Sequence, residues 1–331
     1  MVLISKNSYP LAVVFTLVVL LAVYGYNKDI ALTFWANVYK EKFNKCDKDI
    51  DEKQIYRLPA DPVLDSMDDS SLYQTFWKYI NTCQVSCKNL TRLGPPDDDK
   101  GKNVCADDIF KSKPSSCLVY SFGSNFNFKF EEAVWARYKC EIHTFDPSRA
   151  LNGVTIPTGV NFHLIGLSGN NFVRSEPDNW RTLQKYNTKT WNMQTLSSIR
   201  KSLNHTNRII DILKIDIEGW EWSTLPEIMG SGVLQYVKQI CLEVHFGYGI
   251  KVFHHEKKSD TYEFTSEKWG NVQIPDQLKV LRNLFKSGFR IFKYDPITGW
   301  ASRHVNNPSQ DVNTLVEISL VNINWTLAVH R

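Results

Sequence analysis

The segment Ile209–Ile215 constrains the fold of this chain more than any other stretch. Its seven residues are aliphatic except for Asp211 and Lys214. A short apolar run of this kind is typical of a strand that is buried on both faces, as in the centre of a parallel sheet. The polar turn Asp216–Gly219 follows at once, and a helical pattern begins at Trp220. We therefore predict a strand–turn–helix unit of an α/β sheet.

The same alternation of short apolar runs and helical patterns extends through residues 115–331. The predicted strands cover residues 117–122, 140–145, 162–167, 209–215, 237–246, 289–294 and 315–321. The predicted helices cover residues 128–138, 195–203, 220–229 and 275–286. This order predicts a Rossmann-like α/β fold, with a mostly parallel seven-stranded sheet and helices on both faces.

The N-terminal third of the chain has a different character. Residues 11–23 are apolar and uncharged, although a membrane-spanning helix needs roughly 20 such residues. We predict a signal anchor over 1–26, which makes this a single-pass membrane protein; a cleaved signal peptide or a cytosol-facing tail are the alternatives. A stem and cap over 27–114 follows, and the main domain covers 115–331. Within the cap, residues 71–80 have helical spacing and residues 91–116 have loop composition.

Cysteine usage favours an oxidising compartment. Five of the seven cysteines precede the predicted second strand, as in a disulfide-stapled cap. The odd total leaves one thiol unpaired, and we expect Cys241, on a buried strand, to be that thiol. The alternatives are seven reduced cysteines, or half of a zinc site at Cys83 and Cys87. Glycosylation triplets begin at Asn89, Asn204 and Asn324, which also favours a lumenal or extracellular body.

The charge pattern disfavours nucleic acid as a partner. The formal net charge is +4, and the lysines and arginines are scattered among acidic residues. Phosphate backbones are bound by clustered positive charge, which this chain lacks in sequence.

Two residues that follow the first two predicted strands point to a nucleoside-type cofactor. Ligands of open parallel sheets bind beyond the carboxyl ends of the strands. Gly123 follows the first strand, where a glycine lets the backbone turn close to a ligand. Asp146 ends the second strand 23 residues later, where a carboxylate can bind ribose hydroxyls. The alternative role of Asp146 is to cap the turn before Pro147.

The next two strands end in ionisable residues. Lys214, Asp216 and Glu218 have the spacing of one face of a strand, and Glu243 and His245 share a face of the following strand. Charges in such apolar strands are costly to bury unless they are paired or used. We predict Asp216, Glu218, Glu243 and His245 as catalytic residues, with His245 as a possible general base. Binding of a metal by these residues is the alternative, and our main prediction includes no metal.

At this point the chain resembles a known family. The segments VYSFGSNFNFKFEE, IHTFDPS, HLIGLSG, WNMQTLSSI, DILKIDIEGWEWSTL and QICLEVHFG occur in this order. They look like the methyltransferase-domain family that joins FkbM-type enzymes to the secretory-pathway "methyltransferase-like" proteins, over about residues 115–325. The resemblance implies a class I methyltransferase fold that uses S-adenosyl-L-methionine.

By position, the resemblance implies cofactor contacts at Ser121, Gly123, Asp146 and Asp216, with Asp216 near the methyl donor. Such families usually carry an acidic residue at the end of the first strand and further glycines. Here Ser121 and Asn125 stand in those places.

These observations together predict a membrane-anchored, lumenal, S-adenosylmethionine-dependent methyltransferase. Transfer to oxygen is what the resemblance implies, and the acceptor would be a small molecule, a glycan or a secreted protein. One rival is a binding protein that keeps the fold without the activity, which Ser121 and Asn125 motivate. The other rival is a type II glycosyltransferase, because Asp216-Ile-Glu218 imitates a D-x-D metal site.

Overall fold

The structure is a computed structural model. It describes residues 46, 50–96, 100–108, 110–148, 153–175, 190–247, 251–254, 261–263, 272–297, 300–303 and 315–325. They belong to one compact unit, Cys46–Arg331. The predicted anchor over 1–26 lies outside the described residues, and the domain boundaries at 26 and 114 remain predictions.

The predicted single-pass membrane location is contradicted by the helices that the structure describes. None of the helices in the described ranges has both the length and the apolar composition that a bilayer crossing requires.

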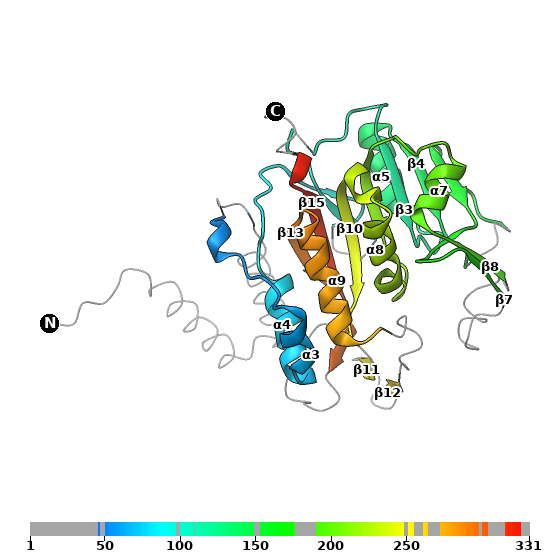
Figure 1. The fold of residues 1–331 in the computed structure, drawn as a ribbon. Coiled ribbons are helices and arrows are strands. Elements are labelled where there is room, and N and C mark those ends of the chain that lie inside the picture. Colours follow the sequence, from blue (N-terminus) through cyan, green and yellow to red (C-terminus); the bar gives the residue numbers. More distant parts are fainter. Residues whose placement is uncertain are drawn as a thin grey trace, which may run out of the picture. The chain divides into compact units, whose positions relative to one another are not determined.

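A seven-stranded sheet forms the centre of the unit (Figure 1). Its strands are β3 (Leu118–Phe122), β4 (Glu141–Phe145), β5 (Val160–His163), β9 (Ile210–Ile215), β10 (Val237–His245), β13 (Phe289–Pro296) and β15 (Leu315–Asn322). Their order is β13-β15-β10-β9-β3-β4-β5. The run from β10 to β5 is parallel, and β15 is antiparallel to both of its neighbours. The mostly parallel seven-stranded sheet is therefore confirmed.

One predicted strand is wrong in extent. Residues 162–167 were expected to form one strand, but β5 ends at His163 and the exposed Leu164 follows it. The chain then enters β6 (Gly166–Leu167), which pairs with β8 (Thr190–Gln194) in a separate three-stranded sheet with β7 (Phe172–Ser175). A continuous apolar pattern does not reveal such a change of partner, because pairing depends on distant residues.

Helices cover both faces of the central sheet, as predicted. On one face, α5 (Lys129–Tyr138) packs with Val119 and Ile212. Helices also cover the other face, which contains Tyr120 and Leu213 (Figure 1). They include α4 (Asp69–Ile80), α7 (Leu196–Ser202), α8 (Glu221–Gly230) and α9 (Ile274–Lys286). The alternation of side chains along β3 and β9 sends apolar groups to both layers, which explains why these strands are apolar throughout.

The cap packs directly on the main domain. It contains the short helices η1 (Glu52–Gln54) and α3 (Asp61–Ser66), followed by α4. Helix α4 begins at its capping residue Asp68, whose side chain accepts a hydrogen bond from the Ser71 amide. The helical spacing over 71–80 is confirmed, and Phe76 of α4 stacks on Phe246 at 3.7 Å between ring centroids, which packs the helix onto the core.

The stretch predicted as a loop over 91–116 contains a β-hairpin instead. Its strands are β1 (Leu90–Leu93) and β2 (Lys102–Cys105), paired antiparallel. All four residues of β2 are buried, and Val104 packs with Leu93 against the face of the sheet that α5 covers. Tertiary burial thus outweighs the turn-rich composition of the flanking residues.

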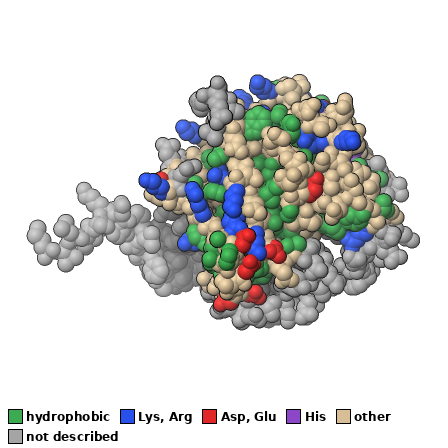
Figure 2. Space-filling view, viewed as in Figure 1, with side chains coloured by type: hydrophobic (Ala, Val, Ile, Leu, Met, Phe, Trp, Pro, Cys, Tyr) green, Lys and Arg blue, Asp and Glu red, His purple; other side chains and the backbone are tan. Residues whose placement is uncertain are grey.

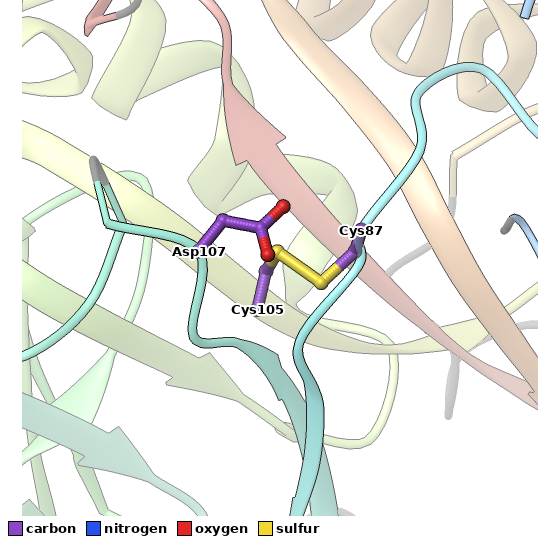
Figure 3. A group of neighbouring side chains, drawn as sticks. All are labelled: Cys87, Cys105 and Asp107. Atoms are coloured by element: carbon purple, nitrogen blue, oxygen red, sulfur yellow. A yellow bond between two sulfur atoms is a disulfide. The ribbon is translucent and has the colours of Figure 1, made fainter. Parts of the chain in front are cut away.

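Disulfides join six of the seven cysteines: Cys46–Cys83, Cys87–Cys105 and Cys117–Cys140. Cys241 is free and buried, as predicted. These bonds exclude both alternatives, the seven reduced thiols and the zinc site at Cys83 and Cys87. Asp107 lies beside the Cys87–Cys105 bond (Figure 3), but sulfurs bonded to each other are not available as thiolate ligands.

Further elements complete the fold. They are η2 (Val233–Tyr236) and a three-stranded sheet of β11 (Lys251–His254), β12 (Thr261–Glu263) and β14 (Trp300–Arg303). Acidic and basic side chains are intermixed on the surface over α3 and α9 (Figure 2). There Lys279 lies 2.6 Å from Asp65 and 2.9 Å from Asp276.

Candidate functional site

The order of the sheet reverses between β3 and β9. From β3 the chain continues through β4 to β5 on one side, whereas β9 leads to β10 on the other. Ligands of open α/β sheets bind at such a switch point, beyond the carboxyl ends of the strands. Gly123 and Asp216 follow the two strands directly. The Asp216 amide donates to the Phe122 carbonyl at 3.2 Å, and the Gly123 amide donates to that of Phe145 at 2.9 Å.

Gly123 is required by the contact between these two strand ends. Its φ of 81° lies in the left-handed region, and a Cβ atom added there would lie 1.6 Å from the Asp216 carbonyl oxygen. The Lys214 ammonium reinforces the contact by donating to the carbonyls of Phe122 at 3.2 Å and Gly123 at 2.9 Å. The glycine therefore lets β3 and β9 meet closely at the place where the crevice begins.

Asp146 holds the turn that follows Gly123. Its carboxylate accepts hydrogen bonds from the amide of Asn125 at 2.6 Å, the amide of Ser148 at 2.9 Å and the hydroxyl of Ser148 at 2.5 Å. A carboxylate offers about four acceptor positions, so roughly one remains, on Oδ2. Asp146 thus stabilises the local turns, which was the alternative role expected for it, and keeps limited capacity for a ligand.

Ser121 lies in the protein interior next to this turn and is not accessible to a ligand. It is fully buried, and its hydroxyl donates to Glu131 Oε1 of α5 at 2.5 Å. Burial raises the pKa of Glu131, although Lys214 and this hydrogen bond oppose the rise. The other Glu131 oxygen has no hydrogen-bond partner within the described ranges. The sequence analysis did not identify Glu131 as a site residue. The one feature that could have indicated it is its position as an acidic residue on the apolar side of a predicted helix.

Asp216 and Glu243 form a coupled pair at the ends of β9 and β10. Burial opposes ionisation of Asp216, but the charges of Lys214, Lys102 and His245 and a hydrogen bond with Glu243 lower its pKa. Burial and the Asp216 charge raise the pKa of Glu243. These opposite shifts favour the proton on Glu243 and the negative charge on Asp216. The Asp216 side chain is 25% exposed, so its carboxylate is partly accessible to solvent beyond the end of β9.

His245 is buried beside this pair and held by Glu221. The Glu221 Oε1 atom lies 2.9 Å from His245 Nδ1 and accepts the His245 amide at 2.8 Å. Burial disfavours the charged ring, but Glu221 raises the pKa of His245 to about 10. This shift favours the protonated ring at neutral pH, whereas a general base must be unprotonated. The catalytic role of His245 stays a prediction. In the sequence Glu221 is only an acid in the first turn of the helix predicted over 220–229, which by itself does not indicate a contact with His245.

Glu218 does not share a strand face with Lys214 and Asp216, so that prediction is wrong. Strand β9 ends at Ile215, and Glu218 has a left-handed φ of 56°. Its side chain is 55% exposed, and its carboxylate lies 3.9 Å from His245 Nε2. Glu218 is thus a solvent-accessible carboxylate beside His245. The corner formed by Glu218 and Gly219 breaks the period-two pattern on which the prediction relied.

Two further charged residues complete the buried cluster. Lys102 of β2 forms an ion pair with Glu317 of β15 and lies 3.7 Å from Glu243. Burial opposes the charge on Lys102, but Glu317, Glu243 and Asp216 raise its pKa. Glu317 could have been identified from the sequence, because it is an acidic residue within the apolar strand predicted over 315–321. Lys102 gave none, because its position depends on the unpredicted hairpin.

Possible metal ligands were also predicted here. One ligand atom each of Asp216, Glu243 and His245 lies within 4.8 Å of the other two. Lys102, Lys214 and the His245 ring already supply positive charge to these carboxyl groups. The cluster is therefore neutralised by the side chains of the protein itself.

Comparisons with known proteins agree with this architecture. A family model described as "Methyltransferase domain" matches residues 23–274, which is more than half of the chain. The probable methyltransferase-like protein 24 of Homo sapiens is 28% identical over 178 residues, which cover 51% of this chain and 46% of that protein. The protein of the same name from Rattus norvegicus matches with the same identity and coverage. The chain thus spans about half the length of these curated relatives, and no solved structure matches it. A seven-stranded sheet with this switch point, together with the family match, shows that the chain belongs to the methyltransferase-domain family.

Proposed function

We propose that this protein is an S-adenosyl-L-methionine-dependent methyltransferase that transfers a methyl group to an oxygen atom of its acceptor. The observation that carries the proposal is the ionised, partly exposed Asp216 at the switch point of a methyltransferase-family sheet. A fixed negative charge at this position suits a sulfonium cofactor, which is positively charged where it reacts.

The side chains around the switch point fit this cofactor. Asp146 has about one acceptor position left, enough for one ribose hydroxyl. The Asp216 carboxylate is available to the cationic end of the cofactor. Gly123 allows the turn after β3 to pass close to the Asp216 backbone. Ser121 is fully buried, so in this proposal it supports the turn through Glu131 and does not contact the cofactor.

The bound cofactor supplies an electrophilic methyl group, and the chain positions the acceptor and manages one proton. Glu218 is the proposed proton acceptor because it is the exposed carboxylate of the cluster. Glu243 keeps its proton and His245 keeps its charge, so both are proposed to stabilise the site rather than act as bases. The positively charged His245 ring lies 3.9 Å from Glu218 and attracts that carboxylate toward the ends of β9 and β10.

An aromatic surface beside Glu218 is the proposed acceptor platform. Trp220 follows the Glu218–Gly219 corner, and its ring lies 5.9 Å from that of Phe172. Arg174 lies over the rings of Trp220 at 5.6 Å and Trp191 at 5.8 Å. Phe172 and the neighbouring Val173 are exposed. A small molecule, a sugar or a peptide that carries a hydroxyl can pack on such a surface and present its oxygen to Glu218.

Titration of the full-length chain with S-adenosylmethionine and with S-adenosylhomocysteine by calorimetry tests the proposal. We expect saturable binding of both, weakened by Asp146→Asn and by Asp216→Asn. Loss of the Asp216 charge should weaken S-adenosylmethionine more than the neutral S-adenosylhomocysteine. The control is Asp276→Asn, an exposed acid of α9 that should bind as the wild type does.

The outcome also separates the rivals. No binding heat at millimolar cofactor would refute the methyltransferase proposal and favour a fold that binds another ligand. Manganese-dependent binding of a nucleotide sugar would instead favour the glycosyltransferase alternative. Glu218 is not in the group of possible metal ligands that contains Asp216, which gives the D-x-D imitation little support.

A further inference from the structure

A second cluster of ionisable side chains lies along β4, and the proposed methyl transfer does not use it. Glu141 and His143 belong to β4, and His163 ends the neighbouring strand β5. His205 and Arg208 lie in the connection between α7 and β9. Both His143 and His205 are only 7% exposed, so their imidazole rings are buried polar groups that need partners.

Three ligand atoms of this cluster converge on one point. Glu141 Oε1 lies 2.9 Å from His143 Nε2 and 3.3 Å from His205 Nε2, and all three atoms lie within 4.8 Å of one another. Ligands about 2.0–2.2 Å from a tetrahedral zinc ion are separated by roughly 3.3 Å. A single zinc ion therefore fits among these atoms with small side-chain adjustments.

Each of the opposite ring nitrogens has a hydrogen-bond partner. His143 Nδ1 lies 2.9 Å from His163 Nε2, and His205 Nδ1 lies 2.8 Å from the Tyr120 hydroxyl. Such outer contacts orient the rings and leave Nε2 free for the ion.

We propose that Glu141, His143 and His205 bind Zn²⁺ and thereby fasten the 204–208 connection to β4. Imidazole nitrogen with one carboxylate is a donor set that zinc prefers. The Glu141 side chain is 38% exposed, so the fourth position of the ion would be open to water or to a further ligand. This site is independent of the proposed methyl transfer.

Arg208 competes for the same atoms. Its guanidinium lies 2.5 Å from Glu141 Oε2 and 3.1 Å from His205 Nε2. Bound zinc would replace the Arg208 guanidinium at His205 Nε2. The contact of Arg208 with Glu141 Oε2 can remain, because the ion would bind the other carboxylate oxygen, Oε1. The Arg208 side chain is 37% exposed and has room to move toward solvent. Removal of this guanidinium should therefore tighten zinc binding, which a purely structural hydrogen-bond network does not predict.

Equilibrium dialysis of the chelator-treated, untagged full chain against ZnCl₂, with metal content measured by mass spectrometry, tests the site. We expect about one zinc per chain and a raised unfolding midpoint, because an ion that binds only the folded state stabilises it. Glu141→Gln should abolish both effects. Tyr120→Phe should weaken binding by about tenfold, as outer-shell changes do. Arg208→Met should bind more tightly than the wild type.

Glu243→Gln is the matched control, since it alters the other carboxyl–histidine cluster. Zinc lost in Glu243→Gln but kept in Glu141→Gln would place the ion in the crevice and overturn the proposal. Absence of binding at micromolar zinc, or unchanged affinity in Arg208→Met, would overturn it as well. Because Glu141 is partly exposed, Glu141→Gln should keep the fold, which circular dichroism verifies independently.

Discussion

Gly123 combines a left-handed backbone with a contact that leaves no room for a side chain, and the two effects can be separated. We predict that Gly123→Ala lowers the free energy of unfolding by about 3 kcal/mol or more, because the new Cβ would overlap the Asp216 carbonyl. Gly153→Ala is the control, with a φ of 75° and no atom within 4 Å of the added Cβ. It should cost only about 1–2 kcal/mol. Urea unfolding measures both, and equal losses would contradict the tight contact.

His245 should make stability depend on pH above neutrality. Its folded-state pKa of about 10 exceeds the ordinary value of 6.5, so the folded chain holds this proton more tightly than the unfolded chain. The stabilisation is complete below about pH 6.5 and is lost as the pH rises through about 10. Denaturant unfolding between these limits should show a steady decline in the free energy of unfolding.

Glu221→Gln tests the cause of that decline. It removes the carboxylate that pairs with the His245 ring, so the pKa of His245 should fall and the dependence on pH should flatten. A variant with the same pH slope as the wild type would show that another group is responsible.

The sequence placed Gly123, Asp146, Asp216, Glu243 and His245 correctly at strand ends, because strand boundaries follow from local apolar runs. It could not give their charge states, which depend on residues far away in the chain. Lys102 approaches Glu243 only through the β1–β2 hairpin, and Glu131 approaches Ser121 only through the packing of α5. The orientation of Glu218 was missed because a single left-handed residue reverses the expected face.

At the scale of elements, the strands and helices of the main domain were predictable from periodicity, whereas the short hairpins were not. Strands such as β1 and β7 have four residues each, too few to establish a pattern. Strand β2 is buried although it contains Lys102 and Asn103, since ion pairs and hydrogen bonds with distant strands satisfy these side chains. Such elements are stabilised by tertiary contacts more than by local preference.

The Cys117–Cys140 disulfide joins the residue before β3 to the residue before β4, across α5. We predict that the double variant Cys117→Ala/Cys140→Ala loses about 2–4 kcal/mol of unfolding free energy, since the bond closes a loop with a sequence separation of 23. Thermal or urea unfolding measures the change. Unaltered stability would mean that packing of α5 alone fixes the first two strands.

At the scale of the whole molecule, the disulfide pairing predicts how many free thiols the protein contains, and this number can be measured. Seven cysteines form three disulfides, which leaves one thiol, Cys241. We predict that alkylation of the unfolded, unreduced protein adds a single label, at Cys241, and that the folded protein resists labelling. Burial raises the pKa of this thiol to about 12, which further suppresses its reactivity. Peptide mapping locates the label, and a second adduct would contradict the three pairs.

The close contact of Gly123 with Asp216 has a consequence for hydrogen exchange. The Asp216 amide is bonded to the end of β3, and the Gly123 amide is bonded to the end of β4. These two amide protons exchange when the strand ends separate, and we expect the tight contact to make the ends separate together. A ligand that holds either end should then slow exchange at both amides, so deuterium uptake at Gly123 and Asp216 should report occupancy of the site even when the methyl acceptor is unknown.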